Sequence, residues 1–161
     1  MPDTSIVKNL SEEMLDRVGL TIADPTLRRV YSYWRARVVD GRLPSRRDID
    51  PLELPYVMGN VILVDVERTP LRFRYRLAGS NITHRMGFDP TGHYVDQHPD
   101  PTMRERIRRN YLDVERSGLP KPFARDEIVD GRVRRYDALM LPLSNDGVTV
   151  SMIAVVMRFR D

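Results

Sequence analysis

The stretch "NVILVDVERTPLRFRYRLAG", residues 60–79, determines the fold class of this chain. Its first part, residues 60–66, is a run rich in β-branched residues, which is typical of a buried strand. Its second part alternates Phe73, Tyr75 and Leu77 with arginines, and this pattern predicts a strand with one buried face. The stretch therefore predicts two β-strands that follow one another along the chain.

The last forty residues predict three more strands. The segments "ARDEIV" (124–129), "VRRYDALMLPLS" (133–144) and "VTVSMIAVVMRF" (148–159) are separated by Asp130-Gly131 and by Asn145-Asp146-Gly147. Asp-Gly supplies the positive φ angles that tight hairpin turns require. Five strands joined in this way predict an α+β fold with a five-stranded antiparallel sheet.

Four Asp-Pro pairs, at 24–25, 50–51, 89–90 and 100–101, are predicted helix starts. Aspartate caps the first turn of a helix, and proline fits the first helical position because it has no N–H to leave unpaired. Apolar residues recur at helical spacing over 25–38 and over 101–117, and a shorter helix is predicted over 11–18. Asp50 and Glu53 have the spacing of a capping box, so the polar segment at 43–60, Ser45 included, is interpreted as scaffold.

Composition excludes several classes of protein. The 161 residues, 41% hydrophobic and 30% charged, fit one globular domain. The 26 basic and 23 acidic residues alternate along the chain, so we expect no nucleic-acid partner. The absence of cysteine excludes disulfides, zinc ribbons, thiolate nucleophiles and iron–sulfur clusters. Without a signal peptide or an apolar run of membrane-spanning length, we expect a cytoplasmic protein with no membrane partner.

Several segments, taken in order, resemble a family of bacterial single-domain PAS proteins. They are "LPSRRDIDPLELP" (43–55), "VILVDV" (61–66), "FRYRLAG" (73–79), "MGFDPTG" (86–92) and "YDALMLPLSNDG" (136–147). The resemblance covers roughly residues 25–160. It implies a five-stranded antiparallel sheet, short middle helices and one long helix across the sheet. We therefore divide the chain into an N-terminal segment, 1–22, with a short helix, and a single PAS-like domain, 23–161.

The resemblance also implies a function. It suggests a sensory or regulatory domain for signal transduction, without catalytic activity, that forms a homodimer and acts through another signalling protein. PAS domains hold small ligands between the sheet and the helices. Flavin sensors of the LOV type need a cysteine, and haem sensors take a histidine from the long helix, here 101–117, which has none. Neither flavin nor haem is expected as a cofactor.

Two groups of apolar residues are candidates for binding. The candidate pocket lining is Phe73, Tyr75, Leu77, Met103, Ile107, Tyr111, Tyr136 and Met140. An ordinary filled core is the alternative for these residues. Arg76 and Arg125 are candidate anchors for an acidic ligand if they point inward, but alternation places Arg76 opposite Tyr75.

The candidate dimer interface is a stripe on the predicted helix over 25–38, formed by Val30, Trp34 and Val38. Packing of this helix on its own sheet explains the stripe equally well.

Three histidines, His84, His93 and His98, lie close to Asp89 and Asp96, but their spacing matches no known metal motif, so we expect no metal. Two other functions remain open beside the sensor. One is a purely structural, dimerising interaction module with a filled core. The other is a small α+β enzyme that uses tyrosine, histidine and aspartate in a cleft.

Overall fold

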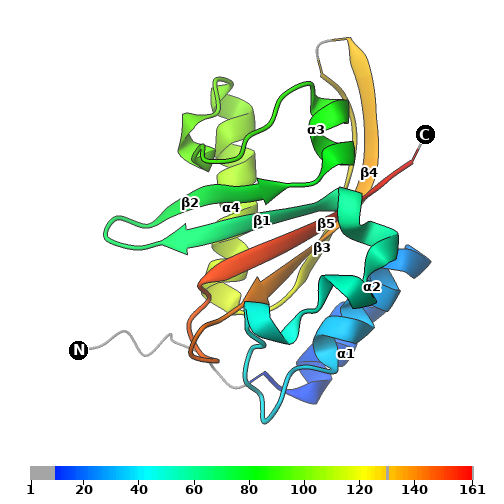
Figure 1. Ribbon diagram of the computed structural model, residues 1–161, viewed down its shortest axis with the longest axis vertical. Coiled ribbons are helices and arrows are strands. Elements are labelled where there is room, and N and C mark those ends of the chain that lie inside the picture. Colours follow the sequence, from blue (N-terminus) through cyan, green and yellow to red (C-terminus); the bar gives the residue numbers. More distant parts are fainter. Residues whose placement is uncertain (1–9, 130, 161) are drawn as a thin grey trace.

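The computed structural model describes residues 10–129 and 131–160, and these fold around one antiparallel sheet (Figure 1). The strand order is β2-β1-β5-β4-β3. The strands are β1 (Val61–Glu67), β2 (Arg72–Ala78), β3 (Lys121–Val129), β4 (Arg132–Leu143) and β5 (Met152–Phe159). The predicted α+β class, with a five-stranded antiparallel sheet, is confirmed.

The helices frame this sheet. The α-helices are α1 (Glu12–Leu20), α2 (Pro25–Arg35), α3 (Ser80–Met86) and α4 (Pro101–Ser117). Short 3-10 helices cover Arg46–Asp48, Pro51–Glu53, Pro55–Asn60 and Val95–Gln97. The predicted helices over 11–18 and 101–117 are present, and α2 ends at Arg35, three residues before the predicted end.

Three of the four Asp-Pro pairs begin helices. Asp24 accepts a hydrogen bond from the Leu27 amide, and Asp100 accepts one from the Thr102 amide. Asp50 caps only a 3-10 turn. At Asp89 the prediction is wrong, because its carboxylate binds the amide and hydroxyl of Thr91 and closes a tight turn. No helix follows until Val95.

The predicted capping box does not form, because the Asp50 side chain accepts from the Leu52 amide and not from that of Glu53. Glu53 does not reach back to Asp50; it pairs with Arg37 at 3.3 Å. The Asp50 amide donates instead to the Tyr33 hydroxyl at 2.9 Å, which ties this segment to α2. Ser45 donates to Asp48 through both its amide and its hydroxyl, so its side chain has a structural role.

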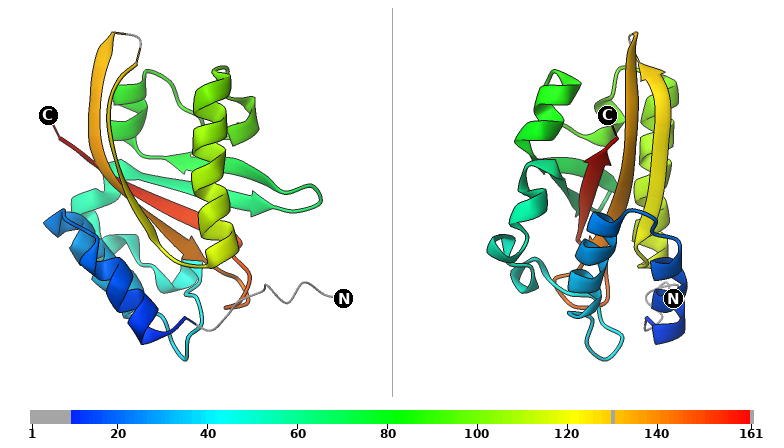
Figure 2. Two further views of the ribbon diagram at one scale, coloured as in Figure 1. Left: turned by 180° about the vertical axis from the view of Figure 1, so that it is seen from behind. Right: turned by 90° about the vertical axis from the view of Figure 1, so that its right-hand side faces the viewer.

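The two faces of the sheet are covered by different helices. Seen from behind, α4 runs across the strands, whereas α1 and α2 lie at the lower edge (Figure 2). Trp34 of α2 is fully buried, and its Nε1 donates to the Pro142 carbonyl oxygen at 2.9 Å. The Tyr31 hydroxyl donates to the Leu15 carbonyl oxygen and fixes α1 on α2. The stripe on α2 therefore packs on the chain's own sheet.

Two strand predictions need correction. The β1–β2 register shifts between Leu63 and Val64, and the extra residue, Arg76, turns Leu77 to the face opposite Tyr75. The last strand begins at Met152, not at 148, because Asp146 accepts hydrogen bonds from the Val148 and Thr149 amides and holds them in a loop. The Asp130-Gly131 turn includes Asp130, which lies outside the described residues.

The start of α3 depends on a close approach of two backbones. A Cβ on Gly79 would lie 2.3 Å from the Gly59 carbonyl oxygen, so only glycine fits there. The Gly79 amide donates to the Val61 carbonyl oxygen at 2.8 Å. This contact fixes where α3 leaves the sheet. Within residues 10–129 and 131–160, no helix is long and apolar enough to cross a membrane.

Candidate ligand-binding cavity

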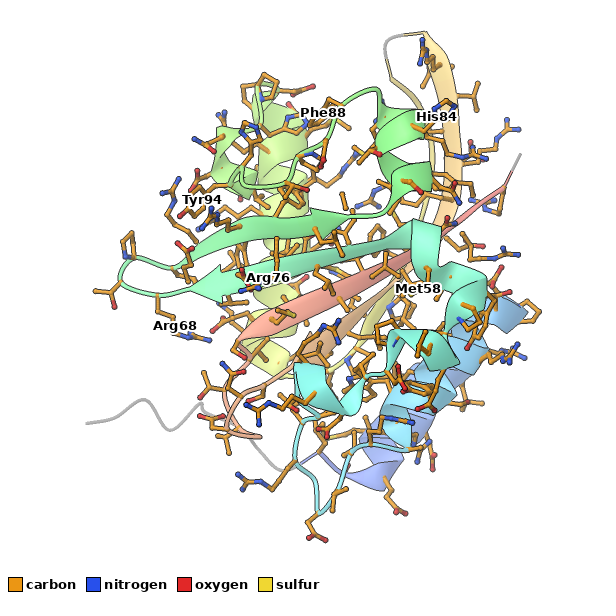
Figure 3. All side chains as sticks on the ribbon, in the orientation of Figure 1. Met58, Arg68, Arg76, His84, Phe88 and Tyr94 are labelled. Atoms are coloured by element: carbon orange, nitrogen blue, oxygen red, sulfur yellow. The ribbon has the colours of Figure 1, made fainter. Side chains whose placement is uncertain are left out.

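A cavity of about 830 Å³ lies between α4 and the sheet. Side chains from the end of α3, from α4 and from all five strands line it. Phe88, just after α3, is half exposed at its edge, on the upper part of the molecule (Figure 3). The apolar side chains of its wall include Ile62, Met86, Met103, Ile107, Phe123, Met140, Val155, Met157 and Phe159.

The structure brings six of the eight candidate lining residues together around this cavity. They are Tyr75, Met103, Ile107, Tyr111, Tyr136 and Met140. Phe73 is buried in the core beside it, with its ring stacked on Tyr111 at 5.4 Å between centroids. Leu77 does not belong to the group, because the bulge places it on the other face of the sheet.

Three phenols give this apolar wall its polar atoms. Burial raises the pKa of Tyr75 to about 12, and a hydrogen bond with Tyr111 lowers that pKa in part. Burial also raises the pKa of Tyr111 well above its ordinary value. The pKa of Tyr136 is raised by burial and by Glu127, and lowered by neighbouring arginines. All three phenols are therefore neutral hydrogen-bonding groups at physiological pH.

Charged residues surround the outer part of the cavity. Arg106 of α4 contacts Glu127 of β3 through two nitrogens, with N–O distances of 2.9 and 3.1 Å. Arg125 and Arg134 also line the cavity, on the strands that form the β3–β4 hairpin. Sequence reasoning considered Arg125 as an anchor but missed Arg106 and Arg134. Residues 134 and 136 differ by two along one strand, so alternation from Tyr136 indicates that Arg134 points to the same face.

A polar cluster holds the loop before α4 on the sheet. Arg72 contacts Asp96 through two hydrogen bonds of 2.7 and 2.8 Å and stacks over the Tyr94 ring at 3.5 Å. The Tyr94 hydroxyl donates to Glu67 at 2.8 Å. These contacts fix the position from which α4 begins, and so the width of the cavity.

The predicted dimer stripe is not a free surface. Val30 and Trp34 are buried within the protomer, and Val38 is partly buried against the same core. Beside α2, the sheet carries a second, small apolar groove of about 90 Å³, lined in part by Met58, Leu63 and Leu77. Met58 and Leu77 are 44% and 49% exposed. An exposed apolar surface is therefore present on this face, but it is not the one predicted.

The three histidines do not gather. His98 lines the cavity, and its Nδ1 accepts a hydrogen bond from the Asp100 amide at 3.1 Å. The His93 carbonyl oxygen accepts from the Tyr75 amide at 2.9 Å, and His84 lies on α3 (Figure 3). Among the residues that the structure describes, no three histidine, aspartate or glutamate side chains are arranged to hold a metal ion.

Comparison with known proteins gives one family and several related structures. The family model described as PAS domain matches residues 22–157. The PAS domain of Bordetella pertussis BvgS is similar at 18% identity and a TM-score of 0.53, over 70% of this chain and 88% of that one. No curated protein sequence matches significantly.

Two further structures contain light-oxygen-voltage domains. One, studied with a flavin analogue, has 17% identity and a TM-score of 0.48, over 68% of this chain and 83% of that one. The other is the light state of Aureochrome1 LOV, with 16% identity and a TM-score of 0.43, over 68% and 87%. At such identities, likeness between structures concerns the fold alone.

Proposed function

The chain belongs to the PAS domain family, and on that premise we propose that it is a sensor which binds a small organic molecule in the cavity between α4 and the sheet. PAS domains are generally sensory domains of signal transduction. The resemblance found in the sequence is thereby confirmed at the level of the family. The bound molecule and its effect are the proposal.

The cavity itself is the observation that carries this proposal. Its volume, about 830 Å³, lies in the range of small-molecule sites, about 300–1,000 Å³. Protein interiors are packed about as densely as organic crystals, so a space that reaches from the surface to the buried side chains of Tyr111 and Met140 favours a binding pocket over an ordinary filled core. Its apolar walls carry three phenols and its lining holds seven arginines, and convergent polar groups on an apolar wall are what orients a ligand in a pocket.

The proposed output is a shift between conformations, passed to another signalling protein. A ligand here contacts both α4 and the β3–β4 hairpin, so it stabilises the conformation in which these elements bind it best. No catalytic role is proposed. Burial keeps Tyr75 and Tyr111 protonated, and a phenol with so high a pKa is a poor general base at neutral pH.

Native and denaturing mass spectrometry of the purified protein tests this proposal. We expect an extra mass in the native spectrum that denaturation releases. Ile107→Trp fills the cavity from α4 and should abolish the extra mass. Arg109→Trp adds the same bulk on an exposed part of α4, outside the cavity lining, and should retain it. A clean native mass, or an extra mass that survives Ile107→Trp, contradicts the proposal.

A second function, a dimerising interaction module, has an observation of its own. The groove with Met58 and Leu77 leaves apolar side chains exposed on the sheet face beside α2. Exposed apolar patches are typical of protein–protein contacts. If a second copy binds there, sedimentation should give twice the protomer mass, and Leu77→Glu should give the protomer alone. A monomer in both cases refutes a homodimer through this groove.

A further inference from the structure

The wall of the cavity on the β3–β4 hairpin carries excess positive charge. Arg125 is paired in register with Tyr136, and Glu127 with Arg134, so these four residues form adjoining rows of the hairpin. Arg106 reaches the same place from α4 through its contact with Glu127. Three guanidinium groups face one carboxylate, which leaves two positive charges unbalanced.

These arginines keep unused hydrogen-bond donors. Among the described residues, the Arg134 guanidinium has no hydrogen-bond or ion-pair partner, although the residue pairs with Glu127 in the strand ladder. Arg125 donates only to the carbonyl oxygen of its neighbour Ala124, at 3.3 Å. Both terminal nitrogens of Arg106 bind Glu127, and its Nε is buried without a hydrogen-bond partner. These donors are therefore free to bind acceptor oxygens that a ligand supplies.

The opposite end of the cavity is apolar. Met140 lies four residues after Tyr136 on β4, about 13 Å further along the strand. It is paired with Val155 of β5, which also lines the cavity. The cavity is thus polar at the hairpin and apolar toward the centre of the sheet.

Taken together with the proposed function, on which this inference rests, the geometry points to an amphiphilic organic anion as the ligand. Its carboxylate head binds between Arg125 and Arg134 at the Tyr136 hydroxyl, and its apolar body lies against Met140 and Ile107. Guanidinium groups match a carboxylate with two parallel hydrogen bonds, and a charge placed in a partly buried site needs such pairing.

Isothermal titration of the full chain with decanoate, decanol and decyltrimethylammonium separates charge from chain length. All three have a straight ten-carbon chain, which in decanoate includes the carboxyl carbon, and are used below their micelle-forming concentrations. We expect decanoate to bind at least about tenfold more tightly than decanol, since a hydrogen bond to a charged group is worth a factor of this size. The ammonium compound should bind more weakly than decanol.

Variants locate the head group. Arg125→Gln with Arg134→Gln should lower decanoate affinity about tenfold or more and leave decanol affinity unchanged, which also shows that the variant is folded. Arg109→Gln with Arg116→Gln removes the same charge from exposed positions of α4 and should change neither affinity. Glu127→Gln releases Arg106 and should tighten decanoate binding.

The outcomes test the anionic ligand separately from the proposed sensor function on which it rests. Equal binding of decanoate and decanol, or decanoate binding that survives the double variant at residues 125 and 134, overturns the anionic ligand and leaves the sensor proposal in place. A released native ligand without an acidic group does the same. No binding of any compound, with a clean native mass, overturns both.

Discussion

Trp34 forms the buried contact between α2 and the sheet, and its replacement by phenylalanine measures that contact. The indole is 0% exposed, and its Nε1 donates to the Pro142 carbonyl oxygen at 2.9 Å. Phenylalanine removes the donor, and a buried acceptor left unpaired costs about 1–3 kcal/mol. The smaller ring leaves unfilled volume, which adds to the loss. We expect the free energy of unfolding to fall by about 2–4 kcal/mol.

Urea denaturation followed by far-ultraviolet circular dichroism, at two protein concentrations, tests this expectation. Tyr33→Phe is the matched control: it removes a hydroxyl from the same helix that accepts a hydrogen bond in a more exposed place, and should cost about 1 kcal/mol or less. Because Trp34 packs within the protomer, the loss of stability caused by Trp34→Phe should not depend on protein concentration. Equal losses for the two variants, or a Trp34→Phe loss that grows on dilution, would refute the reasoning.

Three further predictions concern the backbone and the titrating groups. Gly79→Ala should lower the thermal midpoint much more than Gly59→Ala, because the first Cβ meets a carbonyl oxygen at 2.3 Å and the second only the flexible Asn81 amide at 2.8 Å; equal midpoints would contradict this. Hydrogen bonds from Thr149 and Val148 lower the pKa of Asp146 to about 2. The stability that the Asp146 carboxylate contributes is therefore fully present above its unfolded-state pKa of 3.8, and it is lost as the pH falls through 2. Asp146→Asn should therefore be less stable than wild type by about 1 kcal/mol near neutrality, after solvent screening, with the difference vanishing at about pH 2 in urea denaturation; a constant difference would contradict it. Burial raises the pKa of Tyr75 from 10.0 to about 12, so the stability that the neutral phenol contributes is present below pH 10.0 and falls as the pH rises toward 12. Ultraviolet absorbance should show a phenol that ionises at high pH, and Tyr75→Phe should reduce this signal; an unchanged signal would contradict the assignment.

Helices and strand number could be predicted because local chemistry determines them. An aspartate that caps a free amide and a proline that needs no partner act within one turn, so α2 and α4 begin where their Asp-Pro pairs lie. At Asp89-Pro90 the prediction of a helix start was wrong, because the Asp89 carboxylate accepts a hydrogen bond from the Thr91 amide in a tight turn. A cap is therefore a strong local signal only when an apolar face follows for the helix to bury.

The cavity was only partly predictable, for a reason that also lies in the backbone. Strict alternation placed Tyr75 correctly but not Leu77, because one extra residue in β2 reverses the faces after it. A bulge leaves no mark in a run such as "FRYRLAG". The role of Arg106 could not be predicted, because helical spacing alone does not identify which arginine of α4 pairs with Glu127, on a strand distant in sequence.

The strand order has a consequence for how the chain is made. β5 lies at the centre of the sheet, between β1 and β4, yet residues 152–159 follow all the other described strands in sequence. During synthesis, the β1–β2 and β3–β4 hairpins leave the ribosome with their inner edges unpaired, and unpaired edges invite wrong pairing and aggregation. Val155 and Met157 of β5 also line the cavity. The cavity is therefore complete only once β5 has inserted between β1 and β4 and joined the two hairpins.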